Sequence, residues 1–136
     1  MPEATRILAI DPGERRVGLA VSDPLGITAQ GLETFDCQGA DLMDHLRRVV
    51  ETYEVSEVVV GHPLSMSGRP NRTSIEAQAL ARRIEETIGV PVRLWDERLS
   101  SAEARRVLAG SKAKKGSVDR IAAVLILQSY LDSRHQ

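Results

Sequence analysis

The chain has 136 residues, of which 42% are hydrophobic and 27% charged, and its formal net charge is −1. This composition is typical of one globular domain in solution, and the near-neutral charge argues against a general polyanion binder. A single cysteine excludes an internal disulfide, and no apolar run approaches the roughly 20 residues that span a bilayer. Because the first residues also lack the layout of a signal peptide, we expect a single domain over residues 1–136 that is cytoplasmic and binds no membrane.

Two short strands joined by a tight turn are predicted first. Residues 6–11 (RILAID) form an apolar run that ends at Pro12-Gly13, a dipeptide typical of turns. Residues 17–22 (VGLAVS) form a second apolar run close behind it, which favours a hairpin. Residues 28–35 are a weaker candidate for a third strand.

The hydrophobic period then changes from that of a strand to that of a helix. Apolar residues from Leu42 to Tyr53 recur at helical spacing, which predicts an amphipathic helix that begins near Asp41. Residues 57–61 (EVVVG) predict a short buried strand. A loop rich in glycine, proline and serine follows as far as Asn71.

A second helix and a last strand come next. The helix carries an apolar stripe from Ala77 to Ile88 and ends at Gly89, a residue type that commonly follows a helix. Residues 91–96 (PVRLWD) predict the last strand.

The C-terminal part of the chain is predicted to be helical. A short helix begins at Ser100 or Ser101, whose hydroxyl groups suit a helix N-cap. Residues 110–116 (GSKAKKG) predict a flexible stretch with three lysines. The last helix begins near Ser117 and is apolar nearly all round, so we expect it to be buried.

The predicted order β-β-β-α-β-α-β-α-α indicates an α/β fold. Strands that alternate with helices pair in parallel, and the opening meander adds an antiparallel edge. We therefore expect a mixed five-stranded sheet with helices on both faces.

Charge is distributed unevenly along the chain. Residues 32–57 hold seven acidic and two basic residues, net −5, whereas residues 98–120 hold seven basic and two acidic residues, net +5. One end of the domain is therefore expected to be electropositive, although a solvated surface explains these charges equally well.

Acids occur at three places where buried elements begin or end. Asp11 ends the first strand, Asp96 and Glu97 end the last strand, and Asp119 lies in the first turn of the last helix. Each has an ordinary structural explanation: a turn residue, a cap or surface ion pair, and a favourable charge at a helix start. Because side chains alternate along a strand, only one of Asp96 and Glu97 is expected to face Asp11. The residues leave open which one.

Taken together, the acids predict a metal site. A divalent ion removes the repulsion among clustered carboxylates, and oxygen-only ligands suit Mg²⁺ or Mn²⁺ rather than zinc. Two such ions about 3.5–4 Å apart commonly serve phosphodiester hydrolysis. A neighbouring lysine-rich loop would hold the flanking phosphates, so the pattern favours a nuclease.

Four segments, in order, resemble the YqgF/RuvX family of ribonuclease H-like proteins. They are AIDPGERRVGLAVSDPLGITAQ (residues 9–30), GHPLSMSGRPN (residues 61–71), WDERLSSAEA (residues 95–104) and KAKKGSVDRIAAVLILQSYL (residues 112–131). Proteins of this family are described as Holliday-junction resolvases or as nucleases of ribosomal RNA precursors. The resemblance covers nearly the whole chain and implies the ribonuclease H-like fold.

The resemblance also implies roles for the acids. It makes Asp11 the first, Glu97 the second and Asp119 the third catalytic and metal-binding acid, with Asp96 as the substitute for the second. Many ribonuclease H-like enzymes have four carboxylates, whereas three are identified here. A weaker second-ion site would follow from that difference.

Glycines and a histidine are expected around these acids. Gly13 and Gly18 predict a turn and a close approach of backbones. Gly61 and His62 open a loop that commonly reads GLPLNMDG in the family and reads GHPLSMSG here, which makes its contacts differ. His62 is expected to be a loop residue near the site rather than a metal ligand.

Basic residues are the candidates for contacts to nucleic-acid phosphates, with a solvated surface as the alternative. They are Arg98, Lys112, Lys114 and Lys115. Arg98 is as well suited to orienting Glu97.

The leading hypothesis is a Mg²⁺- or Mn²⁺-dependent endonuclease, a monomer or weak homodimer, that processes the 5′ end of the 16S ribosomal RNA precursor. RNA is favoured because resolving four-way junction DNA needs two paired sites, and the sequence shows no dimer seam. The Holliday-junction resolvase is the first alternative, and a non-catalytic nucleic-acid-binding module is the second. A nucleotide-binding domain of the actin-like or sugar-kinase type is disfavoured by length, because those proteins use two domains to enclose ATP.

Overall fold

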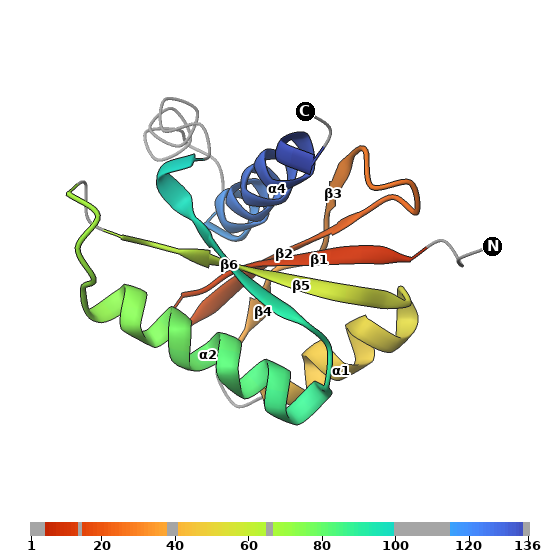
Figure 1. Cartoon of the computed structure of the whole chain (residues 1–136). Coiled ribbons are helices and arrows are strands. Elements are labelled where there is room, and N and C mark those ends of the chain that lie inside the picture. The colour runs from red at the N-terminus through yellow and green to blue at the C-terminus, as the bar shows by residue number, and fades with distance from the viewer. Residues whose placement is uncertain (1–4, 14, 38–40, 65–66, 100–114, 135–136) are drawn as a thin grey trace.

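A mixed β-sheet separates the helices into two layers (Figure 1). The computed structural model describes residues 5–13, 15–37, 41–64, 67–99 and 115–134. The strands are β1 (Arg6–Asp11), β2 (Arg16–Ser22), β3 (Ala29–Gly31), β4 (Phe35–Asp36), β5 (Val55–His62) and β6 (Val92–Asp96). Their order is β3-β2-β1-β5-β6, and β4 also pairs with β2.

The centre of the sheet is formed by the most apolar strands. β1 is antiparallel to β2, with Asp11 opposite Gly18, and parallel to β5, with Ile10 opposite Val60. β5 is in turn parallel to β6. Each of β1, β2 and β5 has a run of at least four buried residues, as expected of strands covered on both faces.

The expected third strand is two short strands, so the sheet has six strands instead of five. β3 pairs with the last three residues of β2, and β4 pairs with the first two. Between them the carbonyl of Leu32 accepts a hydrogen bond from Arg120 Nε at 2.9 Å. That contact with the last helix holds the segment between the two pairings.

Two capped helices follow the hairpin strands. α1 (Leu42–Thr52) begins as predicted, because Asp41 accepts a hydrogen bond from the Met43 N–H at its N-cap. α2 (Arg72–Ile88) begins with a capping box between Asn71 and Ser74. It ends at Gly89, whose φ of 84° is the left-handed conformation that glycine adopts readily.

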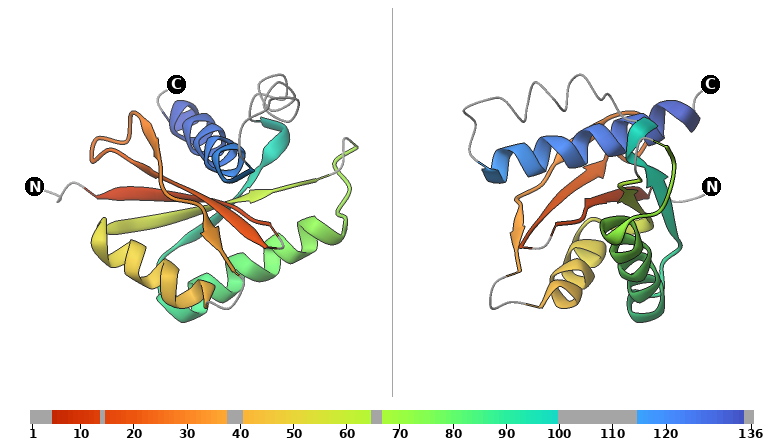
Figure 2. Two further views of the ribbon diagram at one scale, coloured as in Figure 1. Left: turned by 180° about the vertical axis from the view of Figure 1, so that it is seen from behind. Right: turned by 90° about the vertical axis from the view of Figure 1, so that its left-hand side faces the viewer.

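The two faces of the sheet carry different helices, as the views in Figure 2 show. α1 and α2 cover one face, and α4 (Lys115–Arg134) crosses the other. The first face holds the larger core, in which alternate strand residues such as Leu8, Ile10, Leu19 and Val58 pack against Leu46 and Ile84. Ile7, Ala9, Ala20 and Val59 face the opposite way and pack against α4. The expected α/β fold with helices on both faces is confirmed.

The last helix begins at Lys115, two residues before the predicted start. It buries Ala123, Ile126, Leu127 and Leu131 against the sheet, whereas Leu125 is only half-buried. The helix expected from Ser100 or Ser101 and residues 110–114 lie outside the described residues. In the described part of the chain, no helix is long and apolar enough to cross a membrane.

Candidate active site

The alternation of side chains places Asp11 on the face that α4 covers. Ile7 and Ala9 of β1 belong to the core under α4, so Asp11 lies on the same face at the end of the strand. Val59 of β5 belongs to that core as well, which gives Gly61 the same orientation. Asp11 therefore stands where β1 and β5 end beneath the last helix.

Gly18 brings the start of α4 down to the strand pair that carries Asp11. Gly18 is the cross-strand partner of Asp11. A Cβ atom at this position would overlap the backbone carbonyl oxygen of Asp119. Only a residue without a side chain permits this approach, which confirms the close backbone contact expected of Gly18. Asp119 is thereby held beside the β1–β2 pair.

Gly61 makes the corresponding space for the second acid on the other side of β1. It follows Val60, the parallel partner of Ile10, and therefore lies beside the end of β1. A Cβ atom on Gly61 would be 3.3 Å from both Cγ and Cδ of Glu97 and 2.7 Å from Ile126 Cδ1. The side chain of Glu97 thus lies over Gly61, under the edge of α4.

Asp96 and Glu97 occupy different environments. Asp96 pairs in register with His62, whose Nε2 lies 3.1 Å from Gln78 Nε2 on α2, on the face opposite α4. The Asp96 carboxylate accepts hydrogen bonds from Arg98: 3.0 Å from Nε, 2.6 Å from Nη2 and 2.9 Å from the backbone N–H. These bonds from Arg98 hold the pKa of Asp96 below its usual value. Glu97 is therefore the residue of this pair that lies on the face of Asp11.

The carboxylate of Asp119 is incompletely satisfied. Its Oδ2 lies 3.3 Å from Arg16 Nε, an ion-pair distance without hydrogen-bond geometry. Among the described residues, this buried oxygen has no hydrogen-bond partner. A buried acceptor without a donor is unfavourable, so an additional cation or donor fits at this position.

The three acids gather at one corner but do not form a finished metal site. Within the described ranges, no three His, Cys, Asp or Glu side chains are arranged to hold a metal ion. Carboxylate oxygens are nevertheless the donors that Mg²⁺ prefers, and the unsatisfied oxygen of Asp119 is such a donor. The donor chemistry of Asp11, Glu97 and Asp119 suits a hard divalent cation, and their role as its ligands stays a prediction.

The expectation that Gly61 and His62 open a loop is wrong, because they are the last two residues of β5, and the His62 side chain faces α2. The remaining predicted site residues are placed as follows. Gly13 makes the turn after Asp11, where a Cβ atom would overlap the carbonyl of Arg16. Arg98 is exposed and holds Asp96. Lys112 and Lys114 lie outside the described residues, and Lys115 begins α4.

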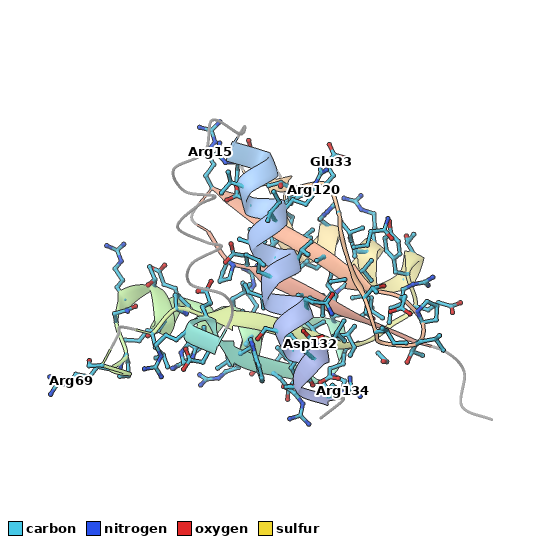
Figure 3. The ribbon with its side chains drawn as sticks, turned by 90° about the horizontal axis from the view of Figure 1, so that it is seen from above. Arg15, Glu33, Arg69, Arg120, Asp132 and Arg134 are labelled. Atoms are coloured by element: carbon cyan, nitrogen blue, oxygen red, sulfur yellow. The ribbon has the colours of Figure 1, made fainter. Side chains whose placement is uncertain are left out.

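Arg16 is the functional candidate that sequence reasoning missed. The only signal for it was a basic residue two positions before Gly18, and nothing local indicated that it would meet Asp119. In Figure 3, Arg15, Arg120 and Glu33 lie near the N-terminal end of α4, and Arg134 lies at the opposite end. Of these basic residues, Arg15 pairs with Asp36 and Arg120 bonds to Leu32, whereas Arg16 meets Asp119.

Comparison with known proteins relates the chain to nucleases over nearly its whole length. A family model described as "RuvX: Holliday junction resolvase" matches residues 5–133. A "Putative pre-16S rRNA nuclease" of Dictyoglomus thermophilum is 47% identical over 133 residues, which are 94% of this chain and 96% of the relative. A protein of Koribacter versatilis with the same description is 50% identical over 135 residues, which are 95% of this chain and 88% of the relative.

Solved structures identify the fold. RuvC from Thermus thermophilus in complex with a Holliday junction substrate superposes with a TM-score of 0.61 at 17% sequence identity, covering 96% of each chain. Another structure of the Thermus thermophilus protein gives a TM-score of 0.62 at 15% identity, again covering 96% of each chain. These likenesses show the ribonuclease H-like fold.

Proposed function

Because this chain belongs to the RuvX family, we propose that it is a metal-dependent endonuclease that trims the 16S ribosomal RNA precursor near its 5′ end. One observation carries the proposal. Asp11 pairs with Gly18, and Gly61 follows Val60, the partner of Ile10. The backbone of Asp119 lies against Gly18, and the side chain of Glu97 lies against Gly61. Two positions without side chains thus bring two further acidic residues to the end of β1, and carboxylates that converge there would suit a divalent cation.

Mg²⁺ or Mn²⁺ is the cation that we assign to these acids. When bound, such an ion neutralises charge on the phosphate and lowers the pKa of water, so that a nucleophile is available near neutral pH. Asp11 is fixed at the end of a strand paired on both sides, and Glu97 is fixed by the turn η1 (Glu97–Leu99). Arg16 neutralises part of the charge on Asp119, which lowers the repulsion among the acids before an ion is present.

The basic residues supply the contacts to the nucleic-acid backbone in this proposal. This role stays a prediction for Arg98, Lys112, Lys114 and Lys115. Arg98 Nη2 already lies 2.6 Å from Asp96 Oδ2, so its first function is to hold the turn that carries Glu97. Contacts to phosphate from the lysines would position the strand without selecting its sequence.

RNA is the favoured substrate, and junction DNA is the alternative. The curated relatives that share 47% and 50% of their residues with this chain are named for the ribosomal RNA precursor. The description of the family model names the Holliday junction instead, which keeps four-way DNA as the second candidate. A binding module without catalysis is the third.

The test is cleavage of a 5′-extended 16S precursor by the purified chain, with Mn²⁺ or with EDTA. Asp11→Asn keeps the size of the side chain and removes its charge, so we expect cleavage to disappear. Glu86→Gln, on the exposed surface of α2, is the matched control and should cleave normally. Cleavage of four-way DNA but not of the RNA would identify junction DNA as the substrate. Binding of either nucleic acid without cleavage would support the binding module.

A further inference from the structure

A pocket of about 440 Å³ opens on the side of the sheet opposite α4. Val17 contributes to its lining and belongs to the core under α1 and α2, which fixes the face on which the pocket lies. Pro12 and Gly13, the two residues after Asp11, line it, and so does Pro63, the residue after β5. The pocket therefore shares its rim with the strand ends that carry the candidate active site.

The lining is apolar with a few acceptors and one cation. Leu42, Ala77 and Leu80 provide the walls between α1 and α2. The charged groups of the lining are the carboxylates of Asp41 and Glu76 and the guanidinium of Arg83. A phosphate group is disfavoured by this charge balance.

A nucleobase matches this chemistry better than a phosphate does. It is flat and largely apolar on its faces, and its edge carries N–H groups that donate hydrogen bonds to carboxylates. Asp41 already accepts a hydrogen bond from the Met43 N–H, and Glu76 accepts one from Arg72 Nε. Because a carboxylate accepts more than one hydrogen bond, both can also bind a base. The volume is in the range of pockets that take small organic ligands.

We infer that this pocket receives an unpaired nucleobase next to the phosphodiester bond that is cut, and that it thereby selects the position of cleavage. The inference rests on the proposed nuclease function. It also rests on placement: Asp11 faces α4, and the next two residues line the pocket, so a nucleic-acid strand lying across this edge meets both. The site is a specificity pocket rather than a part of the acid cluster.

Cys37 provides a test that needs no mutation. It lines the pocket, it is half-buried, and it is the only cysteine in the chain. Burial, with a smaller contribution from Asp36, raises the pKa of this thiol, so alkylation by iodoacetamide at pH 8.5 is slow enough to follow. In EDTA, we expect a saturating single-stranded RNA decamer to slow the alkylation about tenfold. A set of decamers with one abasic nucleotide at successive positions should contain one that binds without protecting Cys37.

Substitutions on the two sides of α2 provide the matched comparison. Leu80→Trp fills the pocket, and Ile75→Trp places the same side chain on the exposed side of the helix. We expect Leu80→Trp to weaken binding of the intact decamer about tenfold and to abolish the effect of the abasic nucleotide, because stacking of one base contributes about that factor. Ile75→Trp should behave like the unchanged protein. Thr73→Trp, at the exposed rim, gives the same test if Leu80→Trp fails to fold.

Equal alkylation rates with every decamer, or a Leu80→Trp variant that keeps full affinity and its abasic response, would overturn the inference. Because both measurements are made without a divalent metal, they do not depend on catalysis. If Cys37 is protected in a base-dependent way but no RNA is cleaved with Mn²⁺, the proposed nuclease function is overturned and the base-binding pocket is kept. Cleavage without base-dependent protection would overturn the pocket alone.

Discussion

At the scale of single residues, the two glycines beside Asp11 differ in what a side chain would meet. At Gly18 it would meet the backbone of Asp119, which moves only if α4 moves. At Gly61 it would meet side-chain atoms of Ile126 and Glu97, which adjust more easily than a helix backbone. The same substitution should therefore have different consequences at the two positions.

We predict that Gly18→Ala lowers the free energy of unfolding by about 1–3 kcal/mol, as overpacking of a core does, and abolishes cleavage. Gly61→Ala should lose less stability but still impair cleavage, because it displaces Glu97. Urea unfolding and a cleavage assay on both variants check this. Full stability of Gly18→Ala would show that α4 does not rest on that glycine.

His45 makes stability depend on pH. Its ring stacks on Phe35 with centroids 4.3 Å apart, and burial, followed by the charge of Arg48, lowers its pKa below the usual 6.5. The folded state therefore binds fewer protons than the unfolded state just below pH 6.5, and stability falls as the pH is lowered through that region. We expect urea unfolding at pH 5.5 and 7.5 to show this loss, and His45→Gln to reduce it. An unchanged pH dependence in His45→Gln would assign the effect to other groups.

At the scale of elements, the sequence predicted those helix ends that depend on interactions between neighbouring residues. The start of α1 at Asp41 and the end of α2 at Gly89 follow from capping, which involves only neighbouring residues. The split of the third strand was not predictable, because the segment between its two pairings is bonded to Arg120, far away in the sequence. The choice between Asp96 and Glu97 required the sheet, since it depends on which face α4 covers.

Asn71 links the start of α2 to the loop beside the site. Its Oδ1 accepts a hydrogen bond from the Ser74 N–H at 2.9 Å, and its Nδ2 donates to the carbonyl of Pro63 at 3.0 Å. We predict that Asn71→Ala lowers the free energy of unfolding by about 1–2 kcal/mol. Asn71→Asp keeps the cap but loses the bond to Pro63, so it should recover part of that loss. Equal stability of the two variants in urea would contradict the role of the cap.

At the scale of the whole molecule, the site is a junction of distant parts of the chain. Asp11 comes from the first strand, Glu97 from the turn after the last strand, and Asp119 from the last helix. The sequence named all three acids, whose role stays a prediction, but it did not name Arg16, because the ion pair between Arg16 and Asp119 exists only once α4 has docked. Binding an ion at this junction must therefore stabilise the entire fold.

We predict that Mn²⁺ raises the melting temperature of the unchanged protein. An ion at 100 times its dissociation constant adds about 2.7 kcal/mol of stability when it binds only the folded state. Asp119→Asn should remove most of this increase, whereas Asp132→Asn, near the other end of α4, should retain it. Differential scanning calorimetry with Mn²⁺ and with EDTA measures the shift. An equal shift in both variants would place the ion elsewhere.

The dependence of the acidic corner on α4 also sets a time order during protein synthesis. Residues of β1 leave the ribosome first, and the helix that brings Asp119 against Gly18 is the last described element to emerge. A nascent chain therefore exposes its sheet before all three acids can meet. If the protein cuts ribosomal RNA precursors, this order keeps an incomplete chain from cutting RNA while it is still attached to a ribosome.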